Sequence, residues 1–398
     1  MTISAWIEKE LGDILTLNYG WSLPDKKRVA GEVPVYGSNG IVGSHNQAFV
    51  DSPGLIIGRK GSAGNVHYSQ NPFCPIDTTF FIAPGDTSLD LRFLYYLLAH
   101  LDLKRILGDV GVPGLNREVA YKEKARFPEK KEEQRKIAGV LGVVQRAIEQ
   151  QERLLALTAE LKKALLHKLF TEGLRGERQK QTEIGPMPES WEMVKMADLF
   201  KIKHGFAFDG EFFKPTGPYI LLTPGHFFES GGFRDQGEKT KFYTGNFPRG
   251  YLLQKGDLLV VMTEQKEGLL GSSAIVPEGD RYLHNQRLGL IQDLDEARLS
   301  KIFLYYLFNT PAVRKSISMT ASGSKVRHTS PSKIRDLLVA LPSLQEQQET
   351  ANILEPVDQK LSVTSRKHAI FTALFSTLRH QLMAAQIRVY DLNIPKLE

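Results

Sequence analysis

The sequence contains almost no cysteine and no long apolar run. It has 398 residues with one cysteine, Cys74, which excludes an intrachain disulfide and a zinc site built from cysteines. No apolar run approaches the ~20 residues that a membrane-spanning helix needs. Residues 1–8 lack the basic region and apolar core of a secretory signal. These absences predict a cytoplasmic protein with no membrane partner.

Neither sign of charge dominates the composition. The chain has 51 Lys and Arg residues against 45 Asp and Glu residues, a net charge of +6 and a pI of about 9.1. This excess is a mild indication of a polyanionic partner. With 41% hydrophobic and 24% charged residues, the composition is that of a globular protein, and the length favours two or more domains.

Motifs for nucleotide, cofactor and metal binding are also missing. Residues 58–64 follow a strand-like run, but their glycine spacing does not fit GxGxxG, and the sequence has no GxxxxGK[ST]. Asn71-Pro72-Phe73 is similar to the Asn-Pro-Pro-aromatic loop of amino-methyltransferases but lacks the second proline. The ten histidines show neither HxxxH nor HExxH spacing. We therefore predict no catalytic residue, no metal site and no cofactor in this chain.

A nuclease site is one alternative. Asp257, followed by Glu264 and Lys266, resembles the Asp…Glu-x-Lys pattern of metal-dependent nucleases. The corresponding strand and loop in the first half of the chain carries Arg59 and Lys60 and no carboxylate. The pattern therefore favours a solvated surface loop over a nuclease.

The most informative feature that is present is an internal duplication. The word FLYYL at residues 93–97 recurs at residues 303–307. Several matches in one order indicate two copies of one unit. Further matched pairs are Trp6 and Asp13 with Trp191 and Asp198, Ala138 and Leu141 with Ala351 and Leu354, and His167 with His380.

Each copy begins with a mixed part that is rich in glycine and proline. Short strand-like runs, such as 54–57 and 257–261, alternate with turn signals such as Ser38-Asn39-Gly40. Each mixed part ends with the FLYYL helix and an extended stretch that leads to Phe127-Pro128 or Leu341-Pro342.

Each copy ends in a long predicted helix. Apolar residues recur at steps of three and four over about six turns, and no glycine or proline lies between Val143 and Phe170. Such a seam in both copies favours pairing of the two helices as an antiparallel coiled coil, with polar seam residues selecting the pairing. The alternative is that each helix covers a globular core. The predicted seam residues are Leu141, Val144, Ile148, Leu155, Leu165, Leu169, Leu354, Val357, Leu361, Phe371, Phe375, Leu378 and Leu382.

The sequence thus predicts an α+β fold with a pseudo-two-fold internal repeat, in which two long paired helices join two mixed α/β domains. Pro356 lies inside the second helix, where proline removes a hydrogen bond. It predicts either a kink or a short helix that ends before a longer one starting near Glu355. The predicted boundaries are 1–130 for the first mixed domain, 131–173 for its helix, 174–190 for a flexible polar linker, 191–342 for the second mixed domain, 343–385 for its helix and 386–398 for a tail.

Basic and amide side chains gather on Gly-rich turns of both mixed parts. Arg and Lys neutralise phosphates and read guanine, and Asn and Gln read adenine. A solvated loop is the alternative for any one of them, but as sets they favour DNA binding. The candidates are Lys26, Lys27, Arg28, Tyr36, Ser38, Asn39, Arg59 and Lys60 in the first copy and Lys203, His204, Thr263, Gln265, Lys325, Arg327 and His328 in the second.

Over nearly its whole length the chain resembles the DNA-specificity subunit of type I restriction-modification systems. The most specific words are VPVYGSNGIVG at 33–43, GLIIGRKG at 54–61 and LTAEL at 157–161. EQRKIA at 133–138 has a weaker twin, EQQETA, at 346–351.

The resemblance implies a DNA-binding subunit that is not itself an enzyme. Each mixed domain would be a target-recognition domain that reads one half of a bipartite, asymmetric target in double-stranded DNA. The paired helices would act as a ruler and as the dock for partners. The implied partners are two modification subunits, which bind S-adenosylmethionine and methylate adenine, and restriction subunits, which use ATP and magnesium. Two alternatives to a DNA-specificity subunit are open. One is the nuclease described above, and the other is a scaffold that joins proteins through its helix pair and does not bind DNA.

Overall fold

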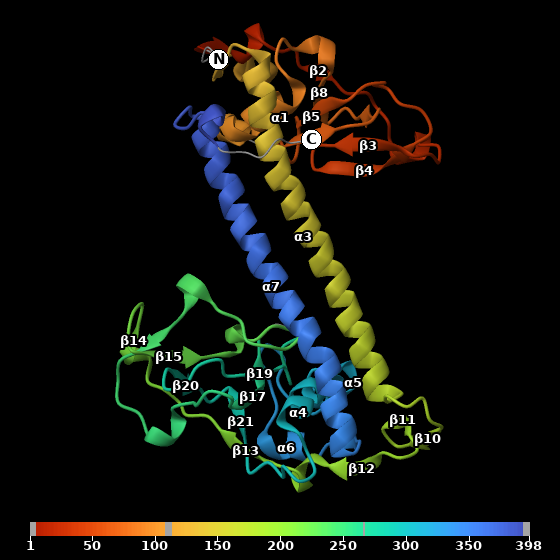
Figure 1. Cartoon of the computed structure of the whole chain (residues 1–398), viewed down its shortest axis with the longest axis vertical. Coiled ribbons are helices and arrows are strands. Elements are labelled where there is room, and N and C mark those ends of the chain that lie inside the picture. The colour runs from red at the N-terminus through yellow and green to blue at the C-terminus, as the bar shows by residue number, and fades with distance from the viewer. Residues whose placement is uncertain (1–4, 108–113, 266, 393–398) are drawn as a thin grey trace. The chain divides into compact units, whose positions relative to one another are not determined.

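The chain folds into two compact units (Figure 1). The computed structural model describes residues 5–107, 114–265 and 267–392. Unit 1 comprises Met1–Leu154 and Thr364–Glu398, and unit 2 comprises Leu155–Val363. Each unit therefore holds one mixed domain and part of both long helices. The folded units do not coincide with the two copies of the sequence repeat, because each long helix is divided between the units.

The mixed domain of unit 1 is built from short strands and two helices. They are β1 (Trp6–Glu10), β2 (Asn18–Tyr19), β3 (Val33–Gly37), β4 (Gly40–His45), β5 (Gly54–Gly58), β6 (Val66–Ser69), β7 (Cys74–Pro75), β8 (Thr79–Ile82), α1 (Leu91–Leu101), α2 (Arg117–Tyr121) and β9 (Lys124–Pro128). A four-stranded sheet has the order β2-β8-β5-β6, and a three-stranded sheet has the order β4-β3-β7. β1 pairs with β9, which joins the start of the domain to its end.

The mixed domain of unit 2 repeats this plan. Its elements are β12 (Glu192–Lys195), β13 (Lys201–His204), β14 (Phe213–Lys214), β15 (Tyr219–Leu222), β16 (Phe242–Tyr243), β17 (Leu258–Val261), β18 (Thr263–Glu264), β19 (Ser273–Ile275), β20 (Tyr282–His284), β21 (Leu288–Gln292), α4 (Lys301–Phe308), α5 (Pro311–Met319), β22 (Arg327–His328), α6 (Pro331–Arg335) and β23 (Leu338–Leu341). The sheet β13-β21-β17-β19 matches β2-β8-β5-β6, and the pair β12-β23 matches β1-β9. A further sheet, β14-β16-β15-β20, contains the parallel pair β15-β20, as β3-β7 does in unit 1.

The strands and helices predicted around the repeated words are confirmed. The runs at 54–57 and 257–261 form β5 and β17, and the FLYYL words lie in α1 and α4. Each of these helices begins at a capping side chain, Asp90 or Ser300, which accepts a hydrogen bond from the third residue of its helix. Such a cap satisfies a backbone N–H that the helix itself leaves without a partner.

The two long helices are α3 (Lys131–Thr171) and α7 (Leu344–Met383). All the seam residues that we predicted are buried or half-buried. None of the helices in the described residues is both long and apolar enough to cross a bilayer.

In unit 1 the first part of α3 packs against the last part of α7. His368 lies 3.1 Å from the carboxylate of Glu152. Phe375 of α7 contacts the ring of Tyr96 at a centroid distance of 6.0 Å, and the Tyr96 hydroxyl donates to Gln145 of α3 at 2.9 Å. In unit 1 Tyr96 of α1 therefore links the two long helices, through an aromatic contact with α7 and a hydrogen bond to α3.

In unit 2 the equivalent contact is ionic. The ammonium of Lys162, on α3, lies 2.6 Å from the carboxylate of Asp358, on α7. That carboxylate also accepts a hydrogen bond from the hydroxyl of Tyr306 at 3.0 Å. By position in the repeat, Lys162 corresponds to Phe375 of unit 1 and Asp358 corresponds to Gln145. The two copies thus use different chemistry at the same seam position.

Helix α7 runs through Pro356 without interruption, so the predicted alternative of two separate helices is wrong. Pro356 and the residue one turn before it, Asn352, are both exposed. The carbonyl that proline leaves without a donor can therefore be hydrated, which lowers the cost of keeping the helix continuous.

The predicted flexible linker is instead a folded hairpin, so that part of the prediction is wrong. β10 (Gln179–Thr182) and β11 (Gly185–Pro188) pair antiparallel. The Lys180 ammonium donates to the carbonyl of Trp191 at 2.7 Å, and Met187 is buried. The polar composition of this segment suggests a solvated linker. In the structure Lys180 instead donates to backbone carbonyls of the segment that follows the hairpin.

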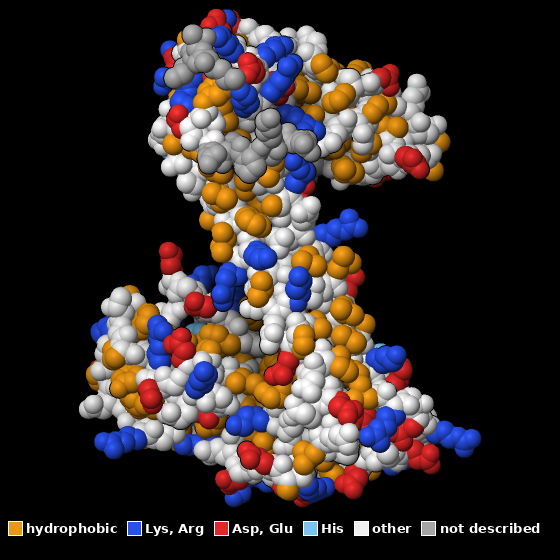
Figure 2. All heavy atoms as spheres, in the orientation of Figure 1, with side chains coloured by type: hydrophobic (Ala, Val, Ile, Leu, Met, Phe, Trp, Pro, Cys, Tyr) orange, Lys and Arg blue, Asp and Glu red, His pale blue; other side chains and the backbone are white. Residues whose placement is uncertain are grey.

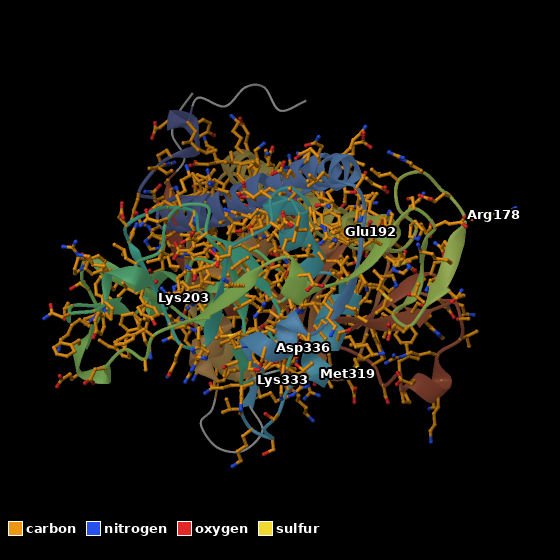
Figure 3. All side chains as sticks on the ribbon, turned by 90° about the horizontal axis from the view of Figure 1, so that it is seen from below. Arg178, Glu192, Lys203, Met319, Lys333 and Asp336 are labelled. Carbon is orange, nitrogen blue, oxygen red and sulfur yellow. The ribbon has the colours of Figure 1, made fainter. Side chains whose placement is uncertain are left out.

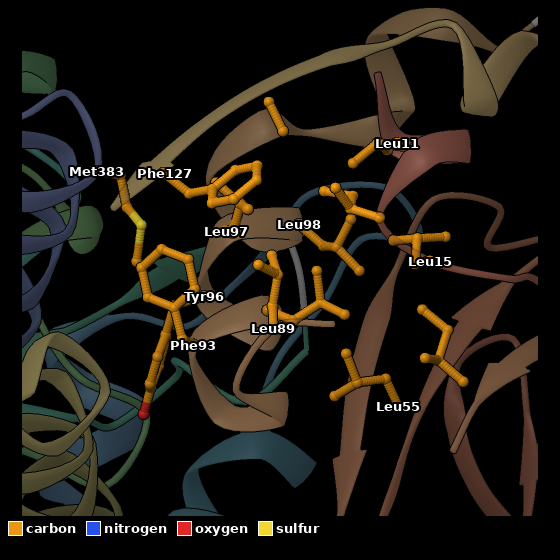
Figure 4. Close-up of a cluster of buried hydrophobic side chains, with 14 of the residues drawn as sticks. Leu11, Leu15, Leu55, Leu89, Phe93, Tyr96, Leu97, Leu98, Phe127 and Met383 are labelled. Atoms are coloured by element: carbon orange, nitrogen blue, oxygen red, sulfur yellow. The ribbon is translucent and has the colours of Figure 1, made fainter. Parts of the chain in front are cut away.

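The largest hydrophobic core of each unit includes residues of both long helices. In unit 1, Figure 4 shows Leu55, Phe93 and Phe127 of the mixed domain in one cluster with Met383 at the end of α7, and Leu141 of α3 belongs to it. The larger core of unit 2 includes Leu166 and Leu169 from the end of α3 and Leu354 from the start of α7. The largest core of each unit therefore combines residues of a mixed domain with residues of both long helices.

A buried glutamine ties each long helix to its own mixed domain. Gln134 accepts from the N–H of Asp90 at 2.8 Å and donates to the carbonyl of Pro128 at 2.9 Å. Gln347 accepts from the N–H of Ser300 at 2.8 Å and donates to the carbonyl of Pro342 at 2.9 Å.

The glutamate before each glutamine binds the segment that follows the other helix. In unit 1 the buried carboxylate of Glu133 accepts two hydrogen bonds, at 2.9 and 2.8 Å, from Arg388, just beyond α7. In unit 2 Glu346 accepts from the N–H of Leu174, just beyond α3, at 3.0 Å. These neighbouring side chains join elements of both copies in each unit.

Two histidines are buried in unit 2. Burial lowers the pKa of His226 and of His284 to about 4 from an ordinary value of 6.5. One ring nitrogen of His284 pairs with the carbonyl of Leu288 at 2.9 Å. The folded unit therefore holds both rings neutral, and their protonation competes with folding.

We predict that unit 2 loses stability as the pH falls from about 6.5 to about 4. In this window the unfolded histidines bind protons that the folded ones exclude, at a cost of about 1.4 kcal/mol per unit of pKa depression. Thermal unfolding at pH 7 and pH 4.5 measures the loss. Replacing His226 and His284 by Gln should shrink this pH-dependent difference, whereas replacing the exposed His328 should not. An unchanged difference in the double variant would contradict the assignment.

Candidate nucleic-acid interface

The turn after the central strand of the four-stranded sheet carries candidate residues in both units. In unit 1, Arg59 and Lys60 follow β5, and their N–H groups both donate to the carbonyl of Thr78, at 2.8 and 3.2 Å. In unit 2, Thr263 and Gln265 follow β17, the equivalent strand. The fold therefore brings the two candidate sets to equivalent places of the two copies.

An exposed tyrosine lies between two arginines at this place in unit 1. The guanidinium carbons of Arg59 and Arg117 lie 5.3 and 5.1 Å from the centroid of the Tyr19 ring, within the range of cation–π attraction. Tyr19 is 50% exposed, and Lys60, which follows Arg59 in the sequence, is exposed as well. Arg59 also donates to the carbonyl of Asp77, which holds its guanidinium in place. We call Tyr19, Arg59, Lys60 and Arg117 the arginine–tyrosine patch.

Tyr19 and Arg117 are not among the residues predicted from the sequence, although the sequence contains a signal for the tyrosine. Tyr19-Gly20-Trp21 corresponds to His204-Gly205-Phe206 in the second copy. A Cβ at Gly20 would lie 2.1 Å from the carbonyl oxygen of Ile76, and one at Gly205 would lie 2.0 Å from that of Asn285. Both backbones thus need glycine for the same close approach, and this approach places Tyr19 and His204 at equivalent positions.

Several candidates of unit 1 serve the fold instead. Arg28 donates to two backbone carbonyls and pairs with a neighbouring carboxylate. Tyr36 is buried, and the Ser38 hydroxyl donates to the carbonyl of Thr78 at 2.6 Å. The candidates of this unit that are exposed are Lys26, Lys27, Asn39 and Lys60.

In unit 2 a short two-stranded ribbon gathers the candidates. β18 pairs with β22, with Thr263 opposite His328. His328 and Gln265 are exposed, as is Lys325 in the turn before β22. Arg327 is half-buried and forms an ion pair with a buried glutamate at 3.1 Å, so it supports the ribbon. Thr263, Gln265, Lys325 and His328 remain as side chains that a ligand can reach.

Lys203 and His204 lie on β13 of the same unit. The Lys203 ammonium, labelled in Figure 3, donates to the carbonyl of Gly250 at 2.6 Å and lies 4.4 Å from the centroid of the Tyr251 ring. His204 is exposed. Of this pair, His204 is therefore the side chain with fewer ties to the fold.

The geometry does not support the nuclease alternative. The two oxygens of Glu264 accept three backbone N–H groups and one guanidinium N–H, which uses the lone pairs that a metal would need. Asp257 lies at the other end of β17, where it accepts from the N–H of Gln254 at 2.8 Å. Lys266 lies outside the described residues. Within those residues no three His, Cys, Asp or Glu side chains gather as a metal site.

The long helices also expose apolar side chains away from their seam. On α3 in unit 2, Leu157 and Leu161 are 54% and 52% exposed, and on α7 in unit 1, Ile370 and Leu374 are 56% and 42% exposed. Figure 2 shows such hydrophobic side chains along the helices. Exposed apolar residues grouped along a helix are typical of a surface that packs against another protein.

Comparison with known proteins identifies relatives. The model of the type I restriction modification DNA specificity domain matches residues 3–159 and 188–370. The specificity subunit of the type I restriction enzyme MjaVIII of Methanocaldococcus jannaschii is 24% identical over 309 residues, which cover 77% of this chain and 72% of the relative. The specificity subunit of the type I restriction enzyme EcoBI of Escherichia coli is 26% identical over 201 residues, 50% of this chain and 39% of the relative.

Solved structures show the same fold. The S subunit of a type I restriction-modification system from M. genitalium superposes with a TM-score of 0.70 at 16% identity, over 95% of this chain and 96% of that one. A structure on complex assembly of the type I R-M system matches with a TM-score of 0.51 at 13% identity, over 96% and 99%. Two matches to the domain model agree with the two copies of the strand order described above. This chain belongs to the type I restriction-modification DNA specificity family.

Proposed function

We propose that this chain is the non-catalytic subunit that reads a bipartite, asymmetric sequence in double-stranded DNA, one half with each unit. The observation that carries the proposal is that both copies present exposed basic or amide side chains at one equivalent turn, after β5 and after β17. Two unlike reading surfaces on one chain suit a target with two unlike halves.

The arginine–tyrosine patch suits contacts to phosphate and base in one half of the target. A guanidinium donates several N–H groups in a fixed fork that matches phosphate or the guanine edge. An exposed tyrosine ring offers a face for stacking. Asn39, exposed in the turn between β3 and β4, adds an amide of the kind that pairs with adenine.

The ribbon of unit 2 carries different chemistry. Thr263 and Gln265 offer hydroxyl and amide groups, and Lys325 and His328 offer a cation and an imidazole. Amide and hydroxyl groups read base edges, whereas a lysine neutralises phosphate. We therefore expect the second half-site to be read mainly through neutral donors and acceptors.

We propose further that the exposed apolar faces of α3 and α7 dock two modification subunits and that restriction subunits join the same complex in the cytoplasm. In this proposal S-adenosylmethionine binds the modification subunits and ATP with magnesium binds the restriction subunits. Support comes from the family and from the exposed Leu157, Leu161, Ile370 and Leu374.

The proposal is tested by co-expressing the chain with the modification subunit of its own system and mapping methylated adenines across the genome. We expect methylation at one sequence with two defined halves and an undefined spacer. The chain without its partner should yield no methylated adenine. Methylation by the chain alone would show that the chain is itself an enzyme. A complex that forms but methylates no defined sequence would favour the scaffold.

We predict that Arg59→Ala and Arg117→Ala each weaken DNA binding by the complex about tenfold or more, since one base or phosphate contact contributes about 1–3 kcal/mol. If the lost contact is to phosphate, the dependence of affinity on salt should fall by about one unit of slope. Arg126→Ala is the matched control, because Arg126 is an exposed arginine of the same unit outside the patch. If Arg59→Ala and Arg117→Ala bind DNA as tightly as Arg126→Ala at every salt concentration, the arginine–tyrosine patch does not contact DNA.

A further inference from the structure

Unit 2 contains a buried carboxylate that holds a loop. Glu264 is 3% exposed. One of its oxygens, Oε2, accepts from the N–H groups of Gly268, Leu269 and Leu270 at 3.0, 2.8 and 2.9 Å. Three consecutive backbone donors converging on one carboxylate oxygen form a strong, charge-assisted anchor.

Two arginines complete the anchor. Arg327 donates to the other oxygen of Glu264 at 3.1 Å and to the carbonyl of Ser318 at 2.8 Å. Arg314 donates to the carbonyls of Leu270, at 2.6 Å, and of Gly268. The backbone between Gly268 and Leu270 is therefore held through its N–H groups by Glu264 and through its carbonyls by Arg314.

The loop needs such an anchor because it is long. In unit 1 the equivalent connection, residues 59–65, closes on itself through the N–H of Gly64 and the carbonyl of Gly58 at 2.8 Å. In unit 2 the connection spans residues 262–272. A loop of that length, without a partner strand on both sides, would otherwise sample many conformations.

The residues next to the anchor are the exposed ones. Gln265 directly follows Glu264 and is exposed, and Thr263 directly precedes it and is half-exposed. Along an extended backbone successive side chains point to opposite faces. Burying the carboxylate of Glu264 therefore turns Thr263 to the opposite face of the ribbon, and Gln265 is exposed directly after the strand ends.

We propose that Glu264 is a positioning residue that fixes the loop through which unit 2 reads its half of the DNA target, with Gln265 as the side chain that contacts the base. This inference rests on the proposed function and deepens it. A carboxamide discriminates between bases only when its plane is held at the base edge, because both of its hydrogen bonds must form together. The ionic anchor supplies this fixed geometry at the cost of a buried charge.

The test compares E264Q, Q265A and E267Q in the full chain, each in complex with its modification subunit. E264Q has the size of the native side chain but turns an amide donor toward groups that are already donors. Q265A removes an exposed side chain and leaves the anchor intact. E267Q is the matched control, since Glu267 is an exposed glutamate of the same loop. The readout is the base preference at every position of the methylated target.

E264Q and Q265A should both relax the preference by roughly tenfold or more at positions within one and the same half-site, the size of one lost base contact. The other half-site should keep its sequence, which shows that the complex is folded, and E267Q should match the native chain. A merely structural role would lower the melting temperature of E264Q without changing the target.

An unchanged target with Q265A overturns the proposal, as does a change in both half-sites. If E264Q gives no complex, R327K replaces it in the test. This variant keeps the positive charge but cannot donate to both Glu264 and the carbonyl of Ser318 through a guanidinium fork. The same relaxed half-site is then expected, and an unchanged half-site overturns the proposal. Failure of the proposed function is a separate result, because the native complex would then methylate no defined sequence.

Discussion

The fold depends on the glutamate–glutamine pair at the start of each long helix. The glutamines, Gln134 and Gln347, bind the mixed domain that precedes their own helix. The glutamates, Glu133 and Glu346, bind the segment that follows the other helix. All four side chains are nearly inaccessible to water, so each bond forms in a medium that strengthens it and that penalises its loss. Each unit is closed only when both copies contribute to it.

The two units hold their candidate DNA-binding residues in place through different interactions. In unit 1 Arg59 and Arg117 lie against the ring of Tyr19, so that the arginine–tyrosine patch is held by cation–π contacts at the protein surface. In unit 2 a longer loop is held from below by a buried carboxylate. The first arrangement tolerates water because its charges stay hydrated, whereas the second depends on the exclusion of water around Glu264.

Much of the architecture could be predicted from sequence because its signals are local. The FLYYL words and the run at 54–57 are each contained in a few consecutive residues, and the helical seam recurs at steps of three and four. The structure contains the corresponding elements. The candidate DNA-binding residues were harder to predict. Arg28 and Ser38 have the composition of DNA-binding residues but bond to the backbone. Arg117 joins Tyr19 only through tertiary contacts that no short pattern records.

The unlike helix contacts of the two units have a consequence for how the gene can change. A chain made from two first copies would place a second Lys162 where Phe375 now lies, beside the neutral Gln145. A chain made from two second copies would leave Asp358 facing an aromatic ring in place of its lysine. Each would leave a charge in the seam without its ionic partner, which destabilises the helix contact. Two identical halves would therefore need compensating changes at this seam position, because the present pairing depends on the difference between the two copies.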